Sequence, residues 1–196
     1  MSIKVNHKKE VLNINLIWDW YRITIEGIFN LKKELKRNQT LLSDPKFTSL
    51  KYMTSEEFEN YFYNLIFQIE ILTTFNIIAA TEGKIKEDFN LKLKKSISNN
   101  ITDQYKELKR KIINRYRCSE ENFMRYLNID EVVDIWKTVQ TGLVHDVGYV
   151  KGMFNFRNWV AHGRFWDPNF GRNYSPKDAH MYSTNLITKF SHIDNW

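Results

Sequence analysis

The sequence contains few of the residues that break helices or cross-link a fold. Its 196 residues include 3 prolines, 7 glycines and a single cysteine, Cys118. One cysteine excludes an internal disulfide and is typical of a reducing compartment, so we expect a cytoplasmic protein. The scarcity of proline and glycine, together with 42% hydrophobic residues, excludes a disordered or fibrous chain and predicts a packed core.

Long apolar runs are also missing. Polar side chains interrupt the most apolar stretch, 65–80, so no apolar run of about 18 residues is present and we expect no membrane-spanning segment. Residues 1–10 are polar and basic, with no apolar stretch behind them. This pattern predicts a flexible basic N-terminus and no secretory signal.

Basic residues moderately outnumber acidic ones, by 29 to 23, which gives a formal net charge of +6. Such an excess suggests a polyanionic partner such as RNA. Two segments, 84–95 and 106–117, hold much of the positive charge, and tyrosines accompany the second. Lys109 and Arg110 are candidate substrate contacts there, because basic faces with aromatic rings bind single-stranded RNA. The alternative is that both segments are ordinary solvated helix faces.

Apolar residues recur at steps of three and four along most of the chain, which is the pattern of amphipathic helices. No hairpin spacing, internal repeat, phosphate-binding glycine loop or flexible linker is evident. The sequence therefore predicts a single all-α domain over 1–196. We expect helices over 13–37, 55–81, 103–117, 119–127, 130–143, 147–162 and 176–190, with 84–98 a lysine-rich helix or loop.

Two of these helices carry clear terminal signals. Thr54 and Glu57 form a capping box in front of the apolar helix 55–81, which we expect to be central. Gly83 is expected to stop this helix. Ser175 is the expected N-cap of the last helix, because a proline follows it at the first helical position.

The segment 154–164 carries the clearest cluster of residues with a chemical use. Arg157 is followed directly by Asn158, and His162 lies four residues after Asn158. Gly163 is expected to close the helix, so His162 falls in its last turn. At 3.6 residues per turn, Asn158 and His162 share a helix face, whereas Arg157 lies about 140° away from His162. One helix therefore presents the arginine and the histidine divergently.

The segment from Arg157 to His162, RNWVAH, resembles the motif of the HEPN superfamily, the higher eukaryotes and prokaryotes nucleotide-binding domains. That motif is an arginine, a polar residue, three variable residues and a histidine on a late helix. The resemblance implies a single-domain antiparallel helical bundle of HEPN type with extra helices. It also implies a metal-independent endoribonuclease without a cofactor, whose homodimer brings two copies of the motif into one cleft.

The same resemblance implies the reaction and its setting. RNA would be cut by transesterification, leaving a 2′,3′-cyclic phosphate and a 5′-hydroxyl. Such domains act as toxins or antiphage-defence effectors, with an antitoxin or a defence-system protein as partner. Some members carry a tyrosine two residues after the histidine, which a partner nucleotidyltransferase modifies. Arg164 stands there in this chain. It is a candidate phosphate contact, or else a solvated charge after a helix end.

The residue types suit RNA cleavage without a metal. His162 can act as base or acid, because the ordinary pKa of histidine is about 6.5. Arg157 supplies a planar, permanent positive charge for phosphate oxygens. Asn158 can orient the imidazole or contact the substrate.

These residues also have purely structural interpretations. Arg157 can pair with a neighbouring carboxylate, and His162 can be a helix C-cap. Glu70 lies in the most apolar helix, where a carboxylate needs a partner, so contact with Arg157 or His162 would orient the motif. The alternative is a partly exposed glutamate between core positions. Aromatic residues near the motif predict either a dimer contact or core packing: Phe154, Phe156, Trp159, Phe165 and Trp166.

Other chemistries find little support. Cys118, His145, His180 and His192 show no metal-ligand spacing, and no serine or cysteine nucleophile with a placed base is evident. Two alternatives to a ribonuclease stay open. One is a non-catalytic HEPN-like module that binds RNA or nucleotide, or that assembles with a partner. The other is a helical DNA-binding regulator, for which the sequence shows no helix-turn-helix pattern.

Overall fold

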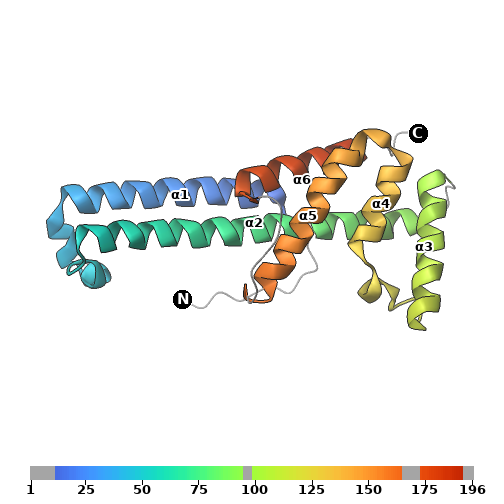
Figure 1. The fold of residues 1–196 in the computed structure, drawn as a ribbon, viewed down its shortest axis with the longest axis horizontal. Coiled ribbons are helices and arrows are strands. Elements are labelled where there is room, and N and C mark those ends of the chain that lie inside the picture. Colours follow the sequence, from blue (N-terminus) through green and yellow to red (C-terminus); the bar gives the residue numbers. More distant parts are fainter. Residues whose placement is uncertain (1–11, 95–98, 165–172, 192–196) are drawn as a thin grey trace.

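The computed structural model describes residues 12–94, 99–164 and 173–191, and the regular elements of these residues are all helical (Figure 1). The predicted all-α class is therefore confirmed, while the expectation for 1–10 lies outside the described residues. The α-helices are α1 (Ile14–Arg37), α2 (Ser55–Lys94), α3 (Asn100–Tyr116), α4 (Ile129–Val139), α5 (Val144–Ala161) and α6 (Pro176–Ser191). Short 3₁₀ helices are η1 (Gln39–Ser43), η2 (Pro45–Leu50), η3 (Phe123–Tyr126) and η4 (Thr141–Leu143).

The α1 and α2 helices form a long antiparallel hairpin, and their starts follow local capping chemistry (Figure 1). The Asn13 side chain accepts hydrogen bonds from the first backbone N–H groups of α1. The predicted capping box is confirmed, since the Thr54 N–H donates to Glu57 at 2.7 Å and the Glu57 N–H donates to the Thr54 hydroxyl at 3.2 Å. Two 3₁₀ helices fill the turn between α1 and α2.

Gly83 does not end α2, and the prediction that it would was wrong. The helix continues unbroken to Lys94 because its apolar pattern continues, with Ile85 and Phe89 fully buried. Within a helix, glycine costs about 1 kcal/mol relative to alanine, which this burial exceeds. An ion pair between Lys86 and Glu82 at 2.6 Å also spans the glycine.

The other helices gather around the C-terminal half of α2, which contacts each of α3, α4, α5 and α6 as well as α1. The expectation that this helix is central is therefore confirmed. Trp136 of α4 is almost fully buried and stacks on Phe190 of α6. At the far end of the hairpin a second, smaller cluster contains Leu35, Leu50 and Phe62. One helix thus carries two separate apolar cores.

A polar network lies inside the larger core. Tyr105 donates to Asp88 at 3.1 Å, and Lys92 pairs with the same carboxylate at 2.7 Å. The Lys92 ammonium also lies 3.9 Å from the centre of the Phe190 ring. The Trp136 N–H donates to the Tyr105 hydroxyl, which links α4 to this network. A buried ammonium is tolerated here because it has both a carboxylate and an aromatic face.

By length and composition, α2 is also the one helix of the described residues that is long and apolar enough to cross a membrane. The core helix of a soluble protein passes the same test. In this chain α2 packs against the other α-helices, and 33% of its most apolar window is buried within the structure.

Candidate functional site

The RNWVAH segment forms the last turn of α5 and its cap. His162 is the C-cap residue, and its backbone N–H donates to the Asn158 carbonyl at 3.0 Å. The Gly163 N–H donates to Val160 and the Arg164 N–H to Trp159, both at 3.0 Å, which closes the helix with a Schellman motif. Gly163 has a φ of 74°, a conformation that glycine adopts without strain. The predicted helix-terminal position of His162 is confirmed.

Arg157 points back toward the core and forms an ion pair with Glu82 of α2. Its side chain is 27% exposed and that of Glu82 is 15% exposed, so the pair is partly shielded from water. The Arg157 Nε is buried and has no hydrogen-bond partner among the described residues. The carboxylate for the motif arginine is therefore Glu82, which sequence reasoning did not single out because the two residues lie 75 positions apart.

Asn158 and His162 are both exposed and lie one helical turn apart, as predicted. Arg157 is half-buried and directed at α2, so within one chain the arginine and the histidine face different surroundings. Chemically, α5 offers solvent an imidazole and an amide on one face. The Arg157 guanidinium lies on a different face of α5, where it forms an ion pair with the Glu82 carboxylate.

Arg164 lies just beyond the helix end with a φ of 58°. Its Nη2 donates to the Gln68 side chain of α2 at 3.2 Å. This contact links the segment after α5 to the middle of the hairpin. Because the partner is a neutral amide, the Arg164 charge is not neutralised by that contact and is available to an anion.

Among the described residues Glu70 bonds to neither Arg157 nor His162, so the predicted orienting contact is not formed, and Glu70 is a partly exposed glutamate, as in the alternative. The Glu70 carboxylate accepts a hydrogen bond from the Tyr21 hydroxyl of α1 at 3.2 Å. Burial and the adjacent carboxylate raise the pKa of Tyr21 to about 12, so this hydroxyl stays a donor. Glu82 is the pairing residue because it lies 12 positions further along α2, about 18 Å at the helical rise, where α5 crosses.

Glu70 instead lines a cavity of about 430 Å³ between α2, α5 and the segment before α6. Half of the lining residues are aromatic, and Glu70 is the one charged group among the described lining residues. The lining residues are Tyr63, Phe67, Glu70, Ile71, Phe156, Trp159, Asn173, Tyr174, Ser175 and Pro176. Tyr63 and Phe67 were not predicted as site residues, although two aromatic residues four positions apart in a helix lie on one face.

The aromatic residues before the motif mostly belong to the core. Phe154 and Phe156 are buried, and Trp159 is partly buried against the same cluster. For these residues the core interpretation is confirmed, while Phe165 and Trp166 lie outside the described residues. Large exposed apolar side chains lie instead on α1, where Leu16 is 67% and Ile23 is 71% exposed.

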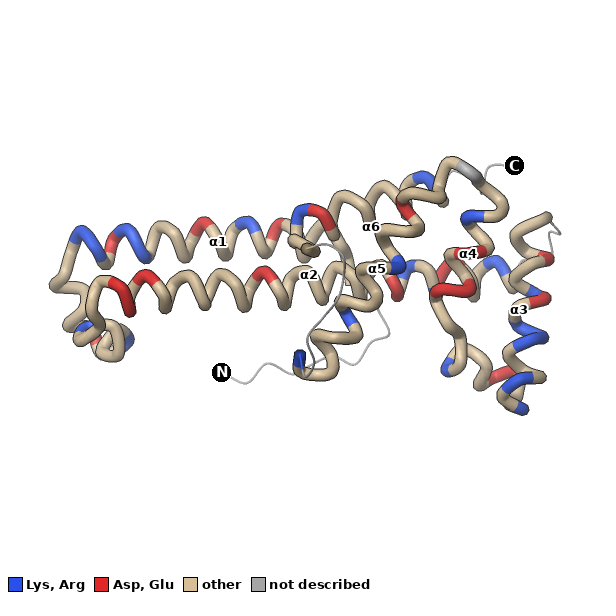
Figure 2. The backbone as a smooth tube through the Cα atoms, in the orientation of Figure 1, with Lys and Arg blue, Asp and Glu red and all other residues tan. Residues whose placement is uncertain are grey.

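The lysines and arginines of the two basic segments are largely paired with carboxylates, and Lys86 of the first segment shares the Glu82 carboxylate with Arg157. The second segment lies on α3, at the far end of α2 from the hairpin tip (Figure 2). Lys109 forms an ion pair with Glu120 at 2.9 Å, and Arg110 pairs with Glu107. Both lie on α3, and their carboxylate partners belong to α3 itself and to the segment that follows it, whereas Arg157 of the motif pairs with α2. The structure therefore does not bring Lys109 and Arg110 together with the motif. Lys92, from the first basic segment, is buried.

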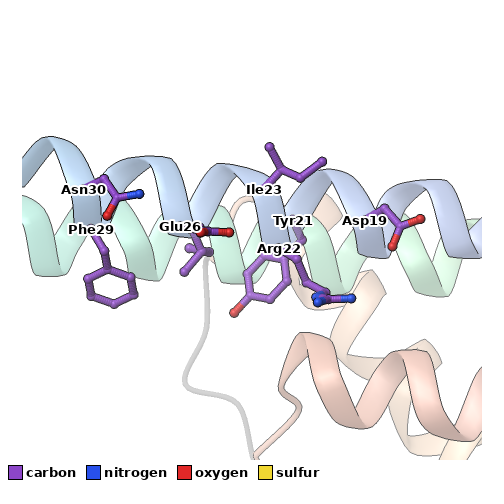
Figure 3. A pocket seen from close by; sticks show the side chains of 8 residues that line it. Asp19, Tyr21, Arg22, Ile23, Glu26, Phe29 and Asn30 are labelled. Carbon is purple, nitrogen blue, oxygen red and sulfur yellow. The ribbon is translucent and has the colours of Figure 1, made fainter.

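A second hollow, of about 650 Å³, runs along α1 (Figure 3). Its described lining comes from α1 alone, and Asp19, Arg22 and Glu26 place charges of both signs on it. Ile23 points away from the side on which Tyr21 and Arg22 lie. An open groove along one helix with mixed charge is a weaker candidate site than the cavity beside the motif, although it is larger.

No group of three or more potential metal-ligating side chains is present among residues 12–94, 99–164 and 173–191. His180 stacks on Trp18 at 4.9 Å, and its Nε2 lies 3.1 Å from the Asn15 side-chain oxygen. His192 lies outside the described residues.

Comparison of the chain with protein-family models, curated proteins and solved structures found no match.

Proposed function

We propose that this chain is a metal-independent endoribonuclease of HEPN type. The observation that supports the proposal is the exposed pair of Asn158 and His162 on the closing turn of α5, beside Arg157 and Arg164. RNA cleavage without a metal needs an acid, a base and a positive charge near the phosphate, and an imidazole and guanidinium groups can supply them. Their concentration within eight consecutive positions at a helix end is the strongest chemical feature of the described surface.

The proposed reaction is attack of an RNA 2′-oxygen on the adjacent phosphorus. The O2′–P bond forms and the P–O5′ bond breaks, leaving a 2′,3′-cyclic phosphate and a 5′-hydroxyl. An imidazole removes the proton from the 2′-hydroxyl or gives one to the departing 5′-oxygen. The guanidinium groups stabilise the charge that builds up on the phosphate oxygens.

Within one chain Arg157 and His162 diverge, so we propose that the active form is a homodimer. A two-fold axis repeats one surface patch on both copies and can place the arginine of one copy near the histidine of the other. The exposed apolar residues of α1 and the hydrophilic end of α5 are the surfaces available for such a contact. Toxin or antiphage-defence function in the cytoplasm, with an antitoxin or defence protein as inhibitor, belongs to the same proposal.

The test is RNA cleavage in EDTA by the wild-type protein, by His162→Ala and by His145→Ala. His145 lies at the opposite end of the same helix and is also exposed, which makes it the matched control. We expect His162→Ala to lose cleavage and His145→Ala to keep it, with cyclic phosphate and 5′-hydroxyl ends on the products. Arg157→Lys should lose most activity, because an ammonium cannot replace the bidentate guanidinium. Full cleavage by folded His162→Ala would remove that residue from the mechanism.

A second candidate function is a non-catalytic module that binds RNA or nucleotide, or that assembles with a partner protein. The Arg157–Glu82 ion pair favours it, because a guanidinium already held by a carboxylate is a common structural feature. The same assay separates the two, since this module would bind RNA without producing new ends.

A further inference from the structure

The cavity beside the last turn of α5 has the size and lining of a small-molecule site. Its volume of about 430 Å³ lies within the range of ligand pockets. Five aromatic side chains from α2, α5 and the segment before α6 line it, and the one charged lining group of the described residues is the Glu70 carboxylate. Such a lining favours a flat ring system that carries hydrogen-bond donors.

The aromatic rings form two groups, one on α2 and one around Phe156. Tyr63 and Phe67 of α2 are parallel to within 5°, with ring centres 6.4 Å apart, and both are exposed. Phe156 is buried on the opposite side, 5.8 Å from Trp159 and 5.7 Å from Tyr174. Exposed, parallel rings are the surfaces on which nucleobases stack in single-strand-binding proteins.

Glu70 gives the cavity a hydrogen-bonding preference. One carboxylate oxygen accepts from Tyr21 at 3.2 Å, and the other has no hydrogen-bond partner among the described residues. An ionised carboxylate only accepts hydrogen bonds. Guanine presents two adjacent N–H donors, at N1 and N2, to such a group. Uracil flanks its one N–H with two carbonyl oxygens, which a carboxylate repels, and adenine and cytosine offer one amino group each.

Arg164 is not one of the described lining residues, but it is bonded to residues at and next to the cavity, and its charge favours an anionic ligand over a cationic one. Aromatic rings with a single carboxylate also suit an organic cation. However, the Arg164 N–H is bonded to the carbonyl of Trp159, a lining residue, and its guanidinium reaches Gln68, the neighbour of Phe67. A guanidinium next to the cavity attracts phosphate and repels a cation. Aromatic rings, one carboxylate and a nearby guanidinium together favour a nucleotide as the ligand.

We propose that this cavity binds the guanine base of a nucleotide, with the base stacked on Tyr63 and Phe67, its N–H edge on Glu70 and its phosphate toward Arg164. The proposal deepens the proposed function and rests on it for one consequence. His162 lies one turn after Trp159, so a guanine seated here would select the phosphate next to it for cleavage.

The direct test is to measure, by titration calorimetry in EDTA, the affinity of His162→Ala protein for GMP, AMP, UMP and CMP. We expect GMP to bind at least about tenfold more tightly than the other three. Glu70→Gln should remove that preference, because the amide presents a donor where guanine needs an acceptor. Phe67→Ala should weaken GMP binding about 5- to 100-fold, the usual effect of losing one stacking ring. Tyr61→Ala, an exposed tyrosine of α2 that does not line the cavity, is the matched control and should bind like the parent.

The two proposals fail separately. Equal binding of the four nucleotides, or GMP binding that neither Glu70→Gln nor Phe67→Ala changes, would overturn the guanine site whatever the cleavage assay shows. GMP binding with the expected variant effects, but no RNA cleavage by the wild-type protein, would uphold the site and refute the ribonuclease. A parallel titration with oligonucleotides that contain or lack one unpaired guanine tells a base within RNA from a free nucleotide. Melting temperatures of all variants verify that each is folded.

Discussion

Arg157 of α5 and Glu82 of α2 form an ion pair that joins the motif helix to the central helix. The ion pair fits two roles of Arg157: a structural arginine that joins two helices, and a catalytic arginine that Glu82 holds in position. The two roles differ in what happens when both partners are replaced together, because a structural pair can be exchanged for apolar side chains and a catalytic one cannot.

We expect Glu82→Met alone to destabilise the protein by about 1–2 kcal/mol, since it leaves a partly buried guanidinium without its carboxylate. The double variant Arg157→Met/Glu82→Met should recover most of that stability, because it removes the partly buried charges. Lys86, which also pairs with Glu82, keeps its charge but is exposed enough to be solvated. RNA cleavage should be lost in the double variant even so. Urea denaturation and a cleavage assay on the same samples check this. A stable double variant that still cuts RNA would show that Arg157 has a structural role only.

The divergence of Arg157 and His162 within one chain predicts complementation between two inactive variants. Arg157→Ala and His162→Ala should each be inactive alone. When they are co-refolded, up to about half of the chains form heterodimers, and each can hold one intact arginine–histidine pair in a shared cleft. Part of the activity should then return. Absence of recovery, or a protein that light scattering shows to be a monomer while fully active, would contradict the dimer.

Gly152 is predicted to be intolerant of a side chain. A Cβ at this position of α5 would overlap the Tyr174 hydroxyl, whose ring lines the aromatic cavity. Gly152→Ala should therefore displace Tyr174 and cost about 1–3 kcal/mol from overpacking, less about 1 kcal/mol gained in helix propensity. The double variant Gly152→Ala/Tyr174→Phe, which removes the overlapping oxygen, should be more stable than Gly152→Ala. Equal melting temperatures for the two would show that the contact is easily relieved.

His180 is expected to make stability depend on pH. Burial lowers its pKa, and the charge of Asp19 opposes this in part. As the pH falls below about 6.5, the unfolded chain protonates this imidazole before the folded protein does. Folded-state stability therefore declines through that range, and this contribution levels off below the folded-state pKa. His180→Gln should flatten the decline in melting temperature between pH 7.5 and 5.5. If the melting temperature of His180→Gln declines as steeply as that of the wild type, the decline is due to other groups.

Local chemistry made several helix ends predictable, whereas side-chain partners across the fold were not. Thr54 with Glu57, and Ser175 in front of α6, satisfy the first N–H groups of their helices with side chains a few residues away. Gly83 misled because its local signal is weaker than the burial of Ile85 and Phe89 that follows. Glu70 and Arg157 could not be assigned partners, since these depend on where α1 and α5 cross α2. Gly163 was enough to predict His162 at a helix end, because glycine closes helices. The pairing of Arg157 with Glu82 could be recognised only once the packing of α5 against α2 was known.

Because α2 runs unbroken through Gly83, the protein has two apolar cores of unequal size on one rod about 60 Å long. The cluster of Leu35, Leu50 and Phe62 is small enough to open by itself, while opening the core around Trp136 requires global unfolding. Amide hydrogens near the hairpin tip should then exchange with solvent through a low-energy local event. The tip can then open and reclose while the end of α5 and the cavity beside it keep their geometry.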